Sequence, residues 1–215
     1  MKYSTILFDL DGTLTDPEQG ICGSVRYALE KAGKPVGPIE SYHKYIGPPL
    51  LRSFEVYANA TPEEAKQLLG FYRERFSTVG LFENEVYPGI PELLRQLRAD
   101  GVVSAVVSNK PDYAVKTLSE QYFPGLLAAS AGAKEGVRKK PCPDSVFEVV
   151  RQLGAEALRA VYIGDSEVDI ETAKNAGMPC ISVSWGFRDR DVLVGAGAGI
   201  ICDDTDALYR ALREG

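Results

Sequence analysis

The stretch Phe8–Asp16, which reads FDLDGTLTD, places acidic side chains directly after an apolar run. The segment from Tyr3 to Leu10 is rich in Ile, Leu and Phe, which predicts a buried strand. Carboxylates crowded at the end of such a strand repel one another, and they are rarely buried unless they are paired or bound to metal. Asp9 and Asp11, with Asp16 close behind, therefore either lie in a solvated turn or have a chemical role.

Short apolar runs alternate with amphipathic stretches along most of the chain. The runs cover residues 4–10, 102–108, 126–130, 160–164, 180–184 and 199–202, and the amphipathic stretches cover 90–99, 112–122, 144–153, 167–176 and 205–213. Strands that alternate with helices predict an α/β fold, in which a Rossmann-like, mostly parallel sheet carries helices on both faces.

Residues 16–84 break this alternation, because they contain four stretches with helical spacing and no convincing strand. These stretches are 20–32, 39–45, 50–58 and 62–78, separated by proline and glycine. The pattern predicts a small all-helical cap domain over 16–84, inserted into an α/β core made of 1–15 and 85–215.

A glycine-rich segment near the end of the chain is similar to a dinucleotide-binding loop. The segment 192–199 reads VLVGAGAG, but its third glycine stands at the wrong offset, and the IICDD that follows predicts a strand where a helix is needed. We interpret Gly195–Gly199 as a flexible turn without a cofactor.

Polar residues follow three of the predicted strands, where an open parallel sheet binds its ligands. The strand ends carry Asp9 and Asp11, then Ser108-Asn109-Lys110, then Asp165 with Asp169 one turn into the next helix, and Arg138-Lys139-Lys140 precedes another helix. Asp9 and Asp11 are two residues apart, so an extended chain directs both side chains to the same side.

This set of residues predicts a phosphoryl-transfer site. Asp9, Asp11 and Asp165 would repel strongly unless a cation lay among them, and oxygen ligands with waters suit Mg²⁺. Ser108, Asn109 and Lys140 would supply hydrogen-bond donors and positive charge to a bound anion. Carboxylates, a divalent cation and donors around one point suit phosphoryl transfer, which depends mainly on positioning and charge neutralisation.

The same motifs resemble the four motifs of the haloacid dehalogenase superfamily. They are DxDGTLTD, the Ser-Asn pair at the second strand end, the lysine before PCPD, and GDSxxD, in the expected order along essentially the whole chain. Helices inserted after the first motif resemble the cap of the phosphoglycolate-phosphatase-like branch. VSNKPDYAVKTL and GDSEVDIETAKNAGMP are similar to that branch as well.

The resemblance implies a role for each matched residue. Asp9 would be the nucleophile that forms an aspartyl-phosphate, and Asp11 the acid and base that serves the leaving group and then water. The carboxylates of Asp9 and Asp165 and the backbone carbonyl of Asp11 would hold Mg²⁺. Asp169 would orient these ligands or Lys140 from outside the metal's direct contacts.

Some assignments stay open at this point. Lys140 directly precedes proline, as the family's lysine does, but its neighbour Lys139 is a rival. Arg52, on a predicted cap helix, is a possible substrate contact, although a solvated arginine is the more common case for such a position. Asp16 is expected to cap the first inserted helix or to support the site.

The expected activity is Mg²⁺-dependent hydrolysis of a small phosphorylated metabolite. The alternatives are a 5′-nucleotidase or pyrophosphatase, a β-phosphoglucomutase-like transferase, and a receiver-type phospho-acceptor module that is not an enzyme. A mutase needs a second anion site in its cap, and residues 45–53, YIGPPLLRS, offer only one arginine. The helical insert and the acceptor Asp in the first strand argue against a receiver. Dehalogenation is not expected, because relatives that perform it lack the acid/base at the position of Asp11.

Composition limits the partners and the compartment. The chain has 215 residues, and 45% of them are hydrophobic, as in an ordinary globular protein. Its formal net charge of −6 argues against a general nucleic-acid or anionic-membrane partner. The four scattered cysteines lack metal-binding spacing, so we expect reduced thiols in a cytoplasmic protein. We expect a monomer or a weak homodimer, with no leader peptide and no membrane span.

Overall fold

The structure, a computed structural model, describes residues 1–214, which separate into two compact units. One unit combines Met1–Thr15 with the chain from Val86 onward, and the other is Asp16–Glu85. Two short strands, β2 (Thr15–Asp16) and β3 (Glu85–Val86), lie at the two points where the chain passes between the units.

The first unit is built on a six-stranded sheet with the strand order β5-β4-β1-β6-β7-β8. Every neighbouring pair is parallel. The strands are β1 (Thr5–Phe8), β4 (Val103–Pro111), β5 (Ala129–Ala133), β6 (Ala160–Gly164), β7 (Cys180–Val183) and β8 (Ile201–Cys202). This sheet confirms the predicted α/β fold class.

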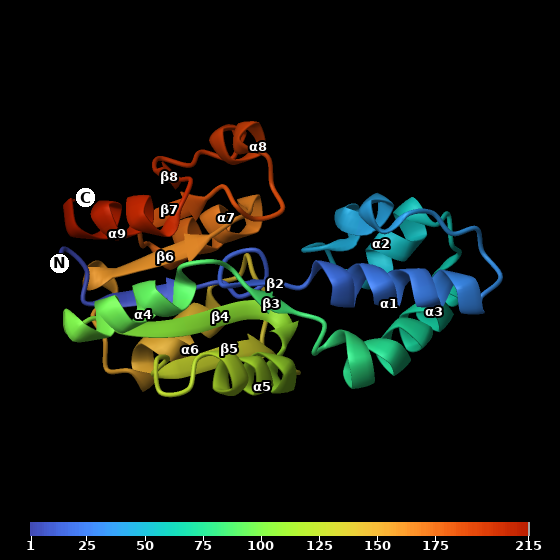
Figure 1. The fold of residues 1–215 in the computed structure, drawn as a ribbon, viewed down its shortest axis with the longest axis horizontal. Helices are drawn as coiled ribbons and strands as arrows, with labels where there is room; N and C mark the ends of the chain where they lie inside the picture. Colours follow the sequence, from blue (N-terminus) through green and yellow to red (C-terminus); the bar gives the residue numbers. More distant parts are fainter. Residues whose placement is uncertain (215) are drawn as a thin grey trace. The chain divides into compact units, whose positions relative to one another are not determined.

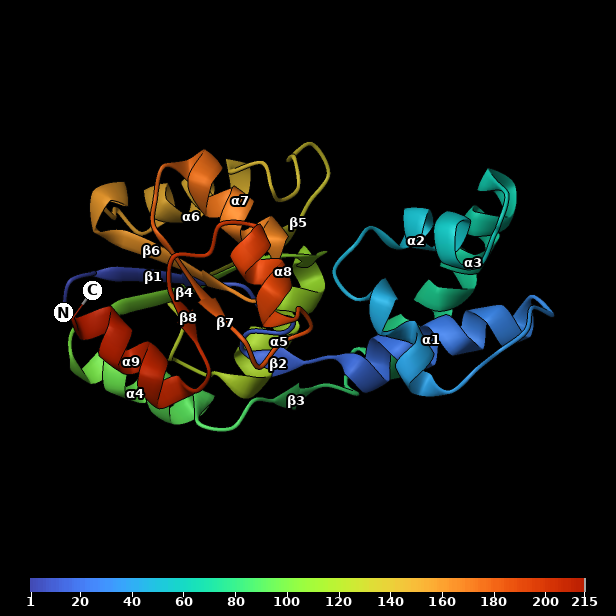
Figure 2. The same cartoon turned by 90° about the horizontal axis from the view of Figure 1, so that it is seen from above.

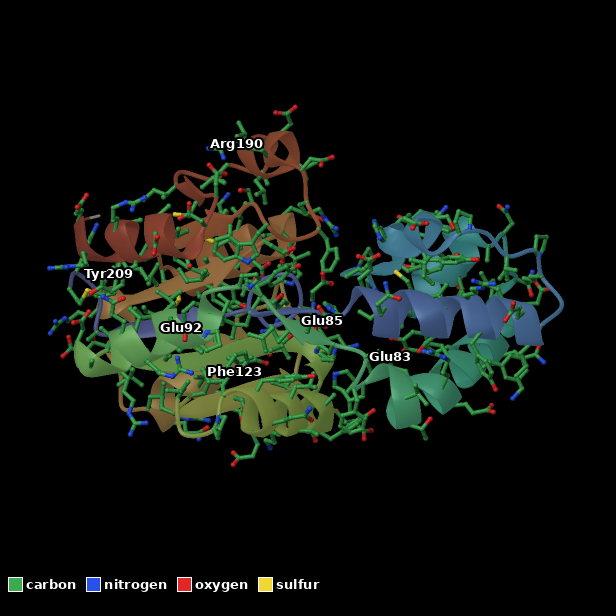
Figure 3. The ribbon with its side chains drawn as sticks, viewed as in Figure 1. Glu83, Glu85, Glu92, Phe123, Arg190 and Tyr209 are labelled. Carbon is green, nitrogen blue, oxygen red and sulfur yellow. The ribbon has the colours of Figure 1, made fainter. Side chains whose placement is uncertain are left out.

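Helices cover both faces of this sheet, as a parallel sheet requires. They are α4 (Ile90–Ala99), α5 (Asp112–Tyr122), α6 (Asp144–Gln152), the short η3 (Ala157–Arg159), α7 (Glu167–Ala176), α8 (Arg190–Gly195) and α9 (Thr205–Glu214). In Figures 1 and 2, α6 and α7 lie on one face, and α4 lies beside α9 on the other. On α9, Tyr209 (Figure 3) donates its hydroxyl to Asp100 Oδ2 at 2.7 Å.

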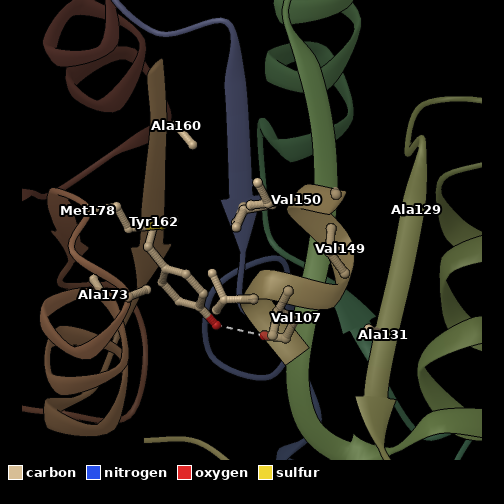
Figure 4. Packing of buried hydrophobic residues seen from close by; sticks show 13 residues of the cluster. Val107, Ala129, Ala131, Val149, Val150, Ala160, Tyr162, Ala173 and Met178 are labelled. Atoms are coloured by element: carbon tan, nitrogen blue, oxygen red, sulfur yellow. Dashed lines mark hydrogen bonds between the residues drawn. The ribbon is translucent and has the colours of Figure 1, made fainter. Parts of the chain in front are cut away.

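The core under α6 and α7 is formed by small and branched side chains around one large aromatic residue (Figure 4). Tyr162 is fully buried there, and its hydroxyl donates to the carbonyl oxygen of Val107 at 2.7 Å. A buried phenol needs such a partner, because an unpaired hydroxyl in an apolar interior is costly. The bond ties β6 to β4 across the intervening strand β1.

The second unit is helical. It consists of α1 (Glu18–Lys31), the 3₁₀ segment η1 (Ile39–Tyr45), α2 (Leu50–Tyr57), α3 (Pro62–Arg75) and the π-helical turn η2 (Phe76–Gly80). Thr61 and Glu64 form a reciprocal capping box at the start of α3. Arg75 makes two hydrogen bonds to Glu83 (Figure 3), at 2.8 and 2.9 Å, which tie the end of α3 to the segment after η2.

Two segments differ from what the sequence pattern indicated. The short helix α8 was not expected, and it ends at Gly195, where the segment interpreted as a flexible turn begins. Strand β5 begins at Ala129, three residues later than the predicted start at residue 126. Its sequence, ASAGA, contains no β-branched residue, so the apolar pattern placed its start poorly. Among residues 1–214, no helix is both long and apolar enough to cross a membrane.

Candidate active site

Three adjacent strands of the sheet bring the predicted residues to one edge. Strand β1 lies between β4 and β6. Asp9 directly follows β1, Ser108 lies near the end of β4, and Asp165 directly follows β6. The backbone N–H of Asp9 donates to the carbonyl oxygen of Ile163 at 2.8 Å, which fixes the end of β1 against β6. All three residues therefore lie together at the carboxyl ends of adjacent strands, where such sheets bind their ligands.

Two glycines make room for the carboxylate of Asp165. Gly12 has φ +87°, in the left-handed region, and a Cβ there would lie 2.3 Å from Asp165 Oδ2. A Cβ on Gly186 would also lie 2.3 Å from that oxygen. The backbone N–H of Phe187 donates to Asp165 Oδ2 at 2.9 Å. The loop after β7 thus contacts an acidic residue of the site directly.

Lys140 lies at the centre of the acidic residues. Its ammonium donates to Asp9 Oδ1 at 2.8 Å, to Asp169 Oδ1 at 2.7 Å and to the Tyr162 hydroxyl at 3.0 Å. Its side chain is 4% exposed, whereas Lys139 next to it is exposed to solvent. The structure therefore places Lys140, and not Lys139, at the site. Tyr162 is a contact that sequence reasoning missed, because its strand pattern indicated only a core residue.

Asn109 positions the backbone that carries Lys140. Its side-chain amide donates to the carbonyl oxygen of Lys140 at 3.1 Å and accepts from the N–H of Lys140 at 2.9 Å. This paired contact holds the loop before α6 against the end of β4. Asn109 thus has a structural role that the sequence did not indicate. Its predicted contact with phosphate stays a prediction.

Asp169 is engaged through both carboxylate oxygens. Oδ1 accepts from Lys140, and Oδ2 accepts from the backbone N–H of Ser166 at 3.1 Å as well as from its hydroxyl. The second contact is part of a capping box that begins α7. Its neighbour Gly164 leaves the necessary space, since a Cβ there would come within 2.3 Å of the Asp169 carboxyl carbon. This geometry agrees with a residue that orients Lys140.

Asp11, the second acidic residue after β1, is bound by a different lysine. Lys110, whose side chain is 3% exposed, donates to both oxygens of Asp11, at 3.0 and 2.8 Å. The sequence showed Lys110 at the strand end but gave it no role. Ser108, which is 5% exposed, accepts from the backbone N–H of Lys110 through its hydroxyl at 3.3 Å.

Two predicted residues belong to the helical unit. Asp16 Oδ1 accepts from the backbone N–H of Glu18, the first residue of α1, at 2.9 Å, so it supports the start of this helix from the position before the N-cap residue Pro17. Arg52 is exposed on α2. Its contact with a substrate stays a prediction.

The buried carboxylates fit a divalent cation. Asp9, Asp165 and Asp169 each offer an oxygen within 4.8 Å of the others. Burial, together with the charges of Asp169 and Asp9, raises the pKa of Asp165 to about 8. Burial also raises the pKa of Asp9 to about 6, against the opposing effect of Lys140. Lys140 is one positive charge among three acids, and an oxygen-only donor set with a charge deficit suits Mg²⁺.

The raised pKa values predict that the stability of the metal-free protein falls as pH rises. The folded state holds protons on Asp9 and Asp165 up to about pH 6 and pH 8, whereas the unfolded chain releases them near 3.8. Because the folded state binds more protons, the free energy of unfolding decreases with pH between about 4 and 8. Thermal unfolding of the metal-stripped protein should show this decrease, and added Mg²⁺ should offset it most at pH 8.

Asp165→Asn is the control for this prediction, because it removes the carboxylate with the largest shift. The variant should have a flatter dependence of melting temperature on pH than the wild type. An equally steep dependence in the two proteins would show that the decrease has another origin.

The motifs and the fold agree with comparisons to known proteins. The family model for haloacid dehalogenase-like hydrolases matches residues 6–183. A 5′-nucleotidase of Pseudomonas aeruginosa is 34% identical over 99% of this chain and 96% of its own length. A phosphoglycolate phosphatase of Pseudomonas savastanoi pv. phaseolicola is 30% identical over 94% of this chain and 77% of its own length.

A solved structure extends the similarity to the whole fold. The crystal structure of a predicted phosphatase from Clostridium acetobutylicum superposes with a TM-score of 0.90 at 35% identity, over 99% of both chains. The family match covers all four motifs that meet at the sheet edge. The chain therefore belongs to the haloacid dehalogenase-like hydrolase family.

Proposed function

We propose that this protein is a Mg²⁺-dependent phosphatase that hydrolyses a small phosphorylated metabolite through an aspartyl-phosphate on Asp9. The observation that carries the proposal is the position of Lys140, whose ammonium contacts Asp9 Oδ1 and Asp169 Oδ1 at the strand ends. A buried lysine beside a carboxylate nucleophile can offset the charge of an incoming phosphoryl group.

The residues of the site can perform the two steps of such a reaction. In the first step, an Asp9 oxygen attacks phosphorus while the ester P–O bond breaks, and Asp11 gives its proton to the leaving oxygen. In the second step, water attacks phosphorus, Asp11 takes the proton of that water, and the bond between Asp9 and phosphorus breaks. The products are an alcohol and inorganic phosphate, and both carboxyl groups return to their initial states.

Mg²⁺ would be held by the carboxylates of Asp9 and Asp165 with the backbone carbonyl of Asp11. When bound, it supplies positive charge that neutralises the phosphoryl oxygens and lowers the repulsion among the acids. Asp169 stays outside this set, because Lys140 and Ser166 already engage its oxygens. The N–H of Phe187 keeps Asp165 in place for the role of ligand.

We expect activity to require Mg²⁺ and Ca²⁺ to inhibit it. Calcium accepts looser and higher coordination, so it could engage both oxygens of Asp9 and leave neither directed at phosphorus. The measurement is release of phosphate from p-nitrophenyl phosphate after extensive dialysis against EDTA, followed by addition of each metal. Full turnover in excess EDTA would refute the metal site.

The site residues act on the phosphoryl group and do not by themselves select the rest of the substrate. Relatives include the 5′-nucleotidase and the phosphoglycolate phosphatase, so nucleoside monophosphates and phosphoglycolate are the first candidates. The helical unit would act as a cap that excludes water and selects the leaving group, with Arg52 as a contact for a substrate anion.

A panel of phosphate monoesters tests the proposed function. It should include nucleoside 5′-monophosphates, phosphoglycolate, sugar phosphates and pyrophosphate, with released phosphate as the readout. β-Glucose 1-phosphate with a trace of the 1,6-bisphosphate tests the mutase alternative. Fast isomerisation with little phosphate release would favour the mutase, and a single stoichiometric phosphorylation without turnover would favour a phospho-acceptor module.

A further inference from the structure

The two acids of the DxD motif are bound by two different lysines. Lys140 contacts Asp9, whereas Lys110 contacts Asp11 through both carboxylate oxygens. The side chain of Lys110 is 3% exposed, and that of Asp11 is 18% exposed. The pair thus lies at the margin of the site, with its lysine buried in the core unit.

The backbone of Lys110 packs closely against the neighbouring strand β5. Lys110 lies near the end of β4, and its carbonyl oxygen would be 2.5 Å from a Cβ on Gly132 of β5. Its N–H donates to the Ser108 hydroxyl at 3.3 Å. The absence of a side chain at Gly132 therefore lets the backbone of Lys110 pass close to β5, and Ser108 binds its N–H. A side chain that starts from a strand packed in this way can position its partner better than one on a loop.

From this geometry we infer that Lys110 is a positioning residue, which holds the carboxyl group of Asp11 in the orientation needed to serve the leaving group and then water. The inference rests on the proposed function. Two hydrogen bonds from one ammonium restrict rotation of the carboxyl group. When Asp11 carries its proton, one oxygen can still accept from Lys110 while the protonated oxygen faces the leaving group.

The inference makes a prediction that depends on the leaving group. An alkoxide needs a proton as it departs, whereas p-nitrophenolate leaves without one. Lys110→Met keeps the unbranched apolar stem of the side chain and removes the donor. We expect its kcat/KM to fall about tenfold to a hundredfold on an alkyl phosphate that the wild type hydrolyses. On p-nitrophenyl phosphate we expect little change in kcat/KM, which includes no step after the leaving group departs, and the Ki of inorganic phosphate should also stay close to that of the wild type.

Three further variants complete the experiment. Lys174→Met, at an exposed lysine on α7, controls for the loss of one positive charge. Asp11→Asn shows whether the acid itself matters. Each single variant leaves one partner of the Lys110–Asp11 ion pair without its counter-ion, which can impair folding. The double variant, Asp11→Asn with Lys110→Met, removes both charges and can be measured even if Lys110→Met folds poorly. If Lys110 acts through Asp11, the double variant should be no slower than Asp11→Asn on the alkyl phosphate.

The outcomes separate the inference from the proposed function. Equal losses on both substrates for Lys110→Met, or a raised Ki for phosphate, would overturn the positioning role and make Lys110 a phosphate ligand. A further loss in the double variant would overturn it as well. If Asp11→Asn shows no leaving-group dependence, the general-acid assignment of the proposed function fails first. A leaving-group effect in Asp11→Asn without one in Lys110→Met refutes the inference alone.

Discussion

Asp9→Asn is expected to reduce turnover by roughly 10³-fold or more while the fold is retained. The amide has nearly the same shape as the carboxylate but cannot attack phosphorus. The change should also raise the melting temperature of the metal-free protein at pH 8, because burial and the charge of Asp169 act against an ionised Asp9. Lys140 keeps Asp169 as a partner after the substitution.

The measurement combines steady-state release of phosphate with thermal unfolding of the same preparation. Asp203→Asn is a matched control, since Asp203 is an exposed carboxylate whose side chain is 69% accessible. The control should keep full activity. Substantial turnover by a folded Asp9→Asn sample would mean that another group attacks phosphorus. That result would refute an aspartyl-phosphate intermediate on Asp9.

Most of the fold was readable from the sequence, because buried strands and amphipathic helices leave distinct patterns. Helices α4, α5 and α7 begin and end at the predicted residues, and so does strand β6. Strand β5 was placed poorly, because its alanines, serine and glycine suit a strand only through their neighbours. The short helix α8 was missed, because six residues are too few to show a helical period.

The site was predictable where its residues follow strands and unpredictable where contacts depend on packing. Asp9, Asp165 and Lys140 stand in motifs whose spacing the chain displays directly. The pairing of Lys110 with Asp11 depends on which lysine reaches which carboxylate, and spacing along the chain does not encode that choice. Likewise, the role of Gly186 arises because a loop after β7 passes within contact distance of Asp165.

Lys140→Met is expected to lower both stability and activity, whereas Lys139→Met should leave both close to wild type. Lys140 is buried, and without it the carboxylates of Asp9 and Asp169 lose their shared cation. Removing one partner of a buried ion pair typically costs about 3–5 kcal/mol of unfolding free energy. Burial alone would lower the pKa of Lys140, but the charges of Asp169 and Asp9 raise it well above its usual value, so the ammonium persists throughout the physiological range.

The pH dependence of that loss identifies its cause. At pH 5 the protonated form of Asp9, whose pKa is about 6, predominates, so the missing cation should matter less than at pH 8. Urea unfolding of wild type, Lys140→Met and Lys139→Met at both pH values measures this difference. Activity should be assayed where Lys140→Met is folded, and a loss of about a hundredfold is expected from the removed charge. A loss of stability in Lys140→Met that is the same at pH 5 and pH 8 would indicate lost packing around Tyr162. Equal effects of Lys140→Met and Lys139→Met would refute the assignment of Lys140 to the site.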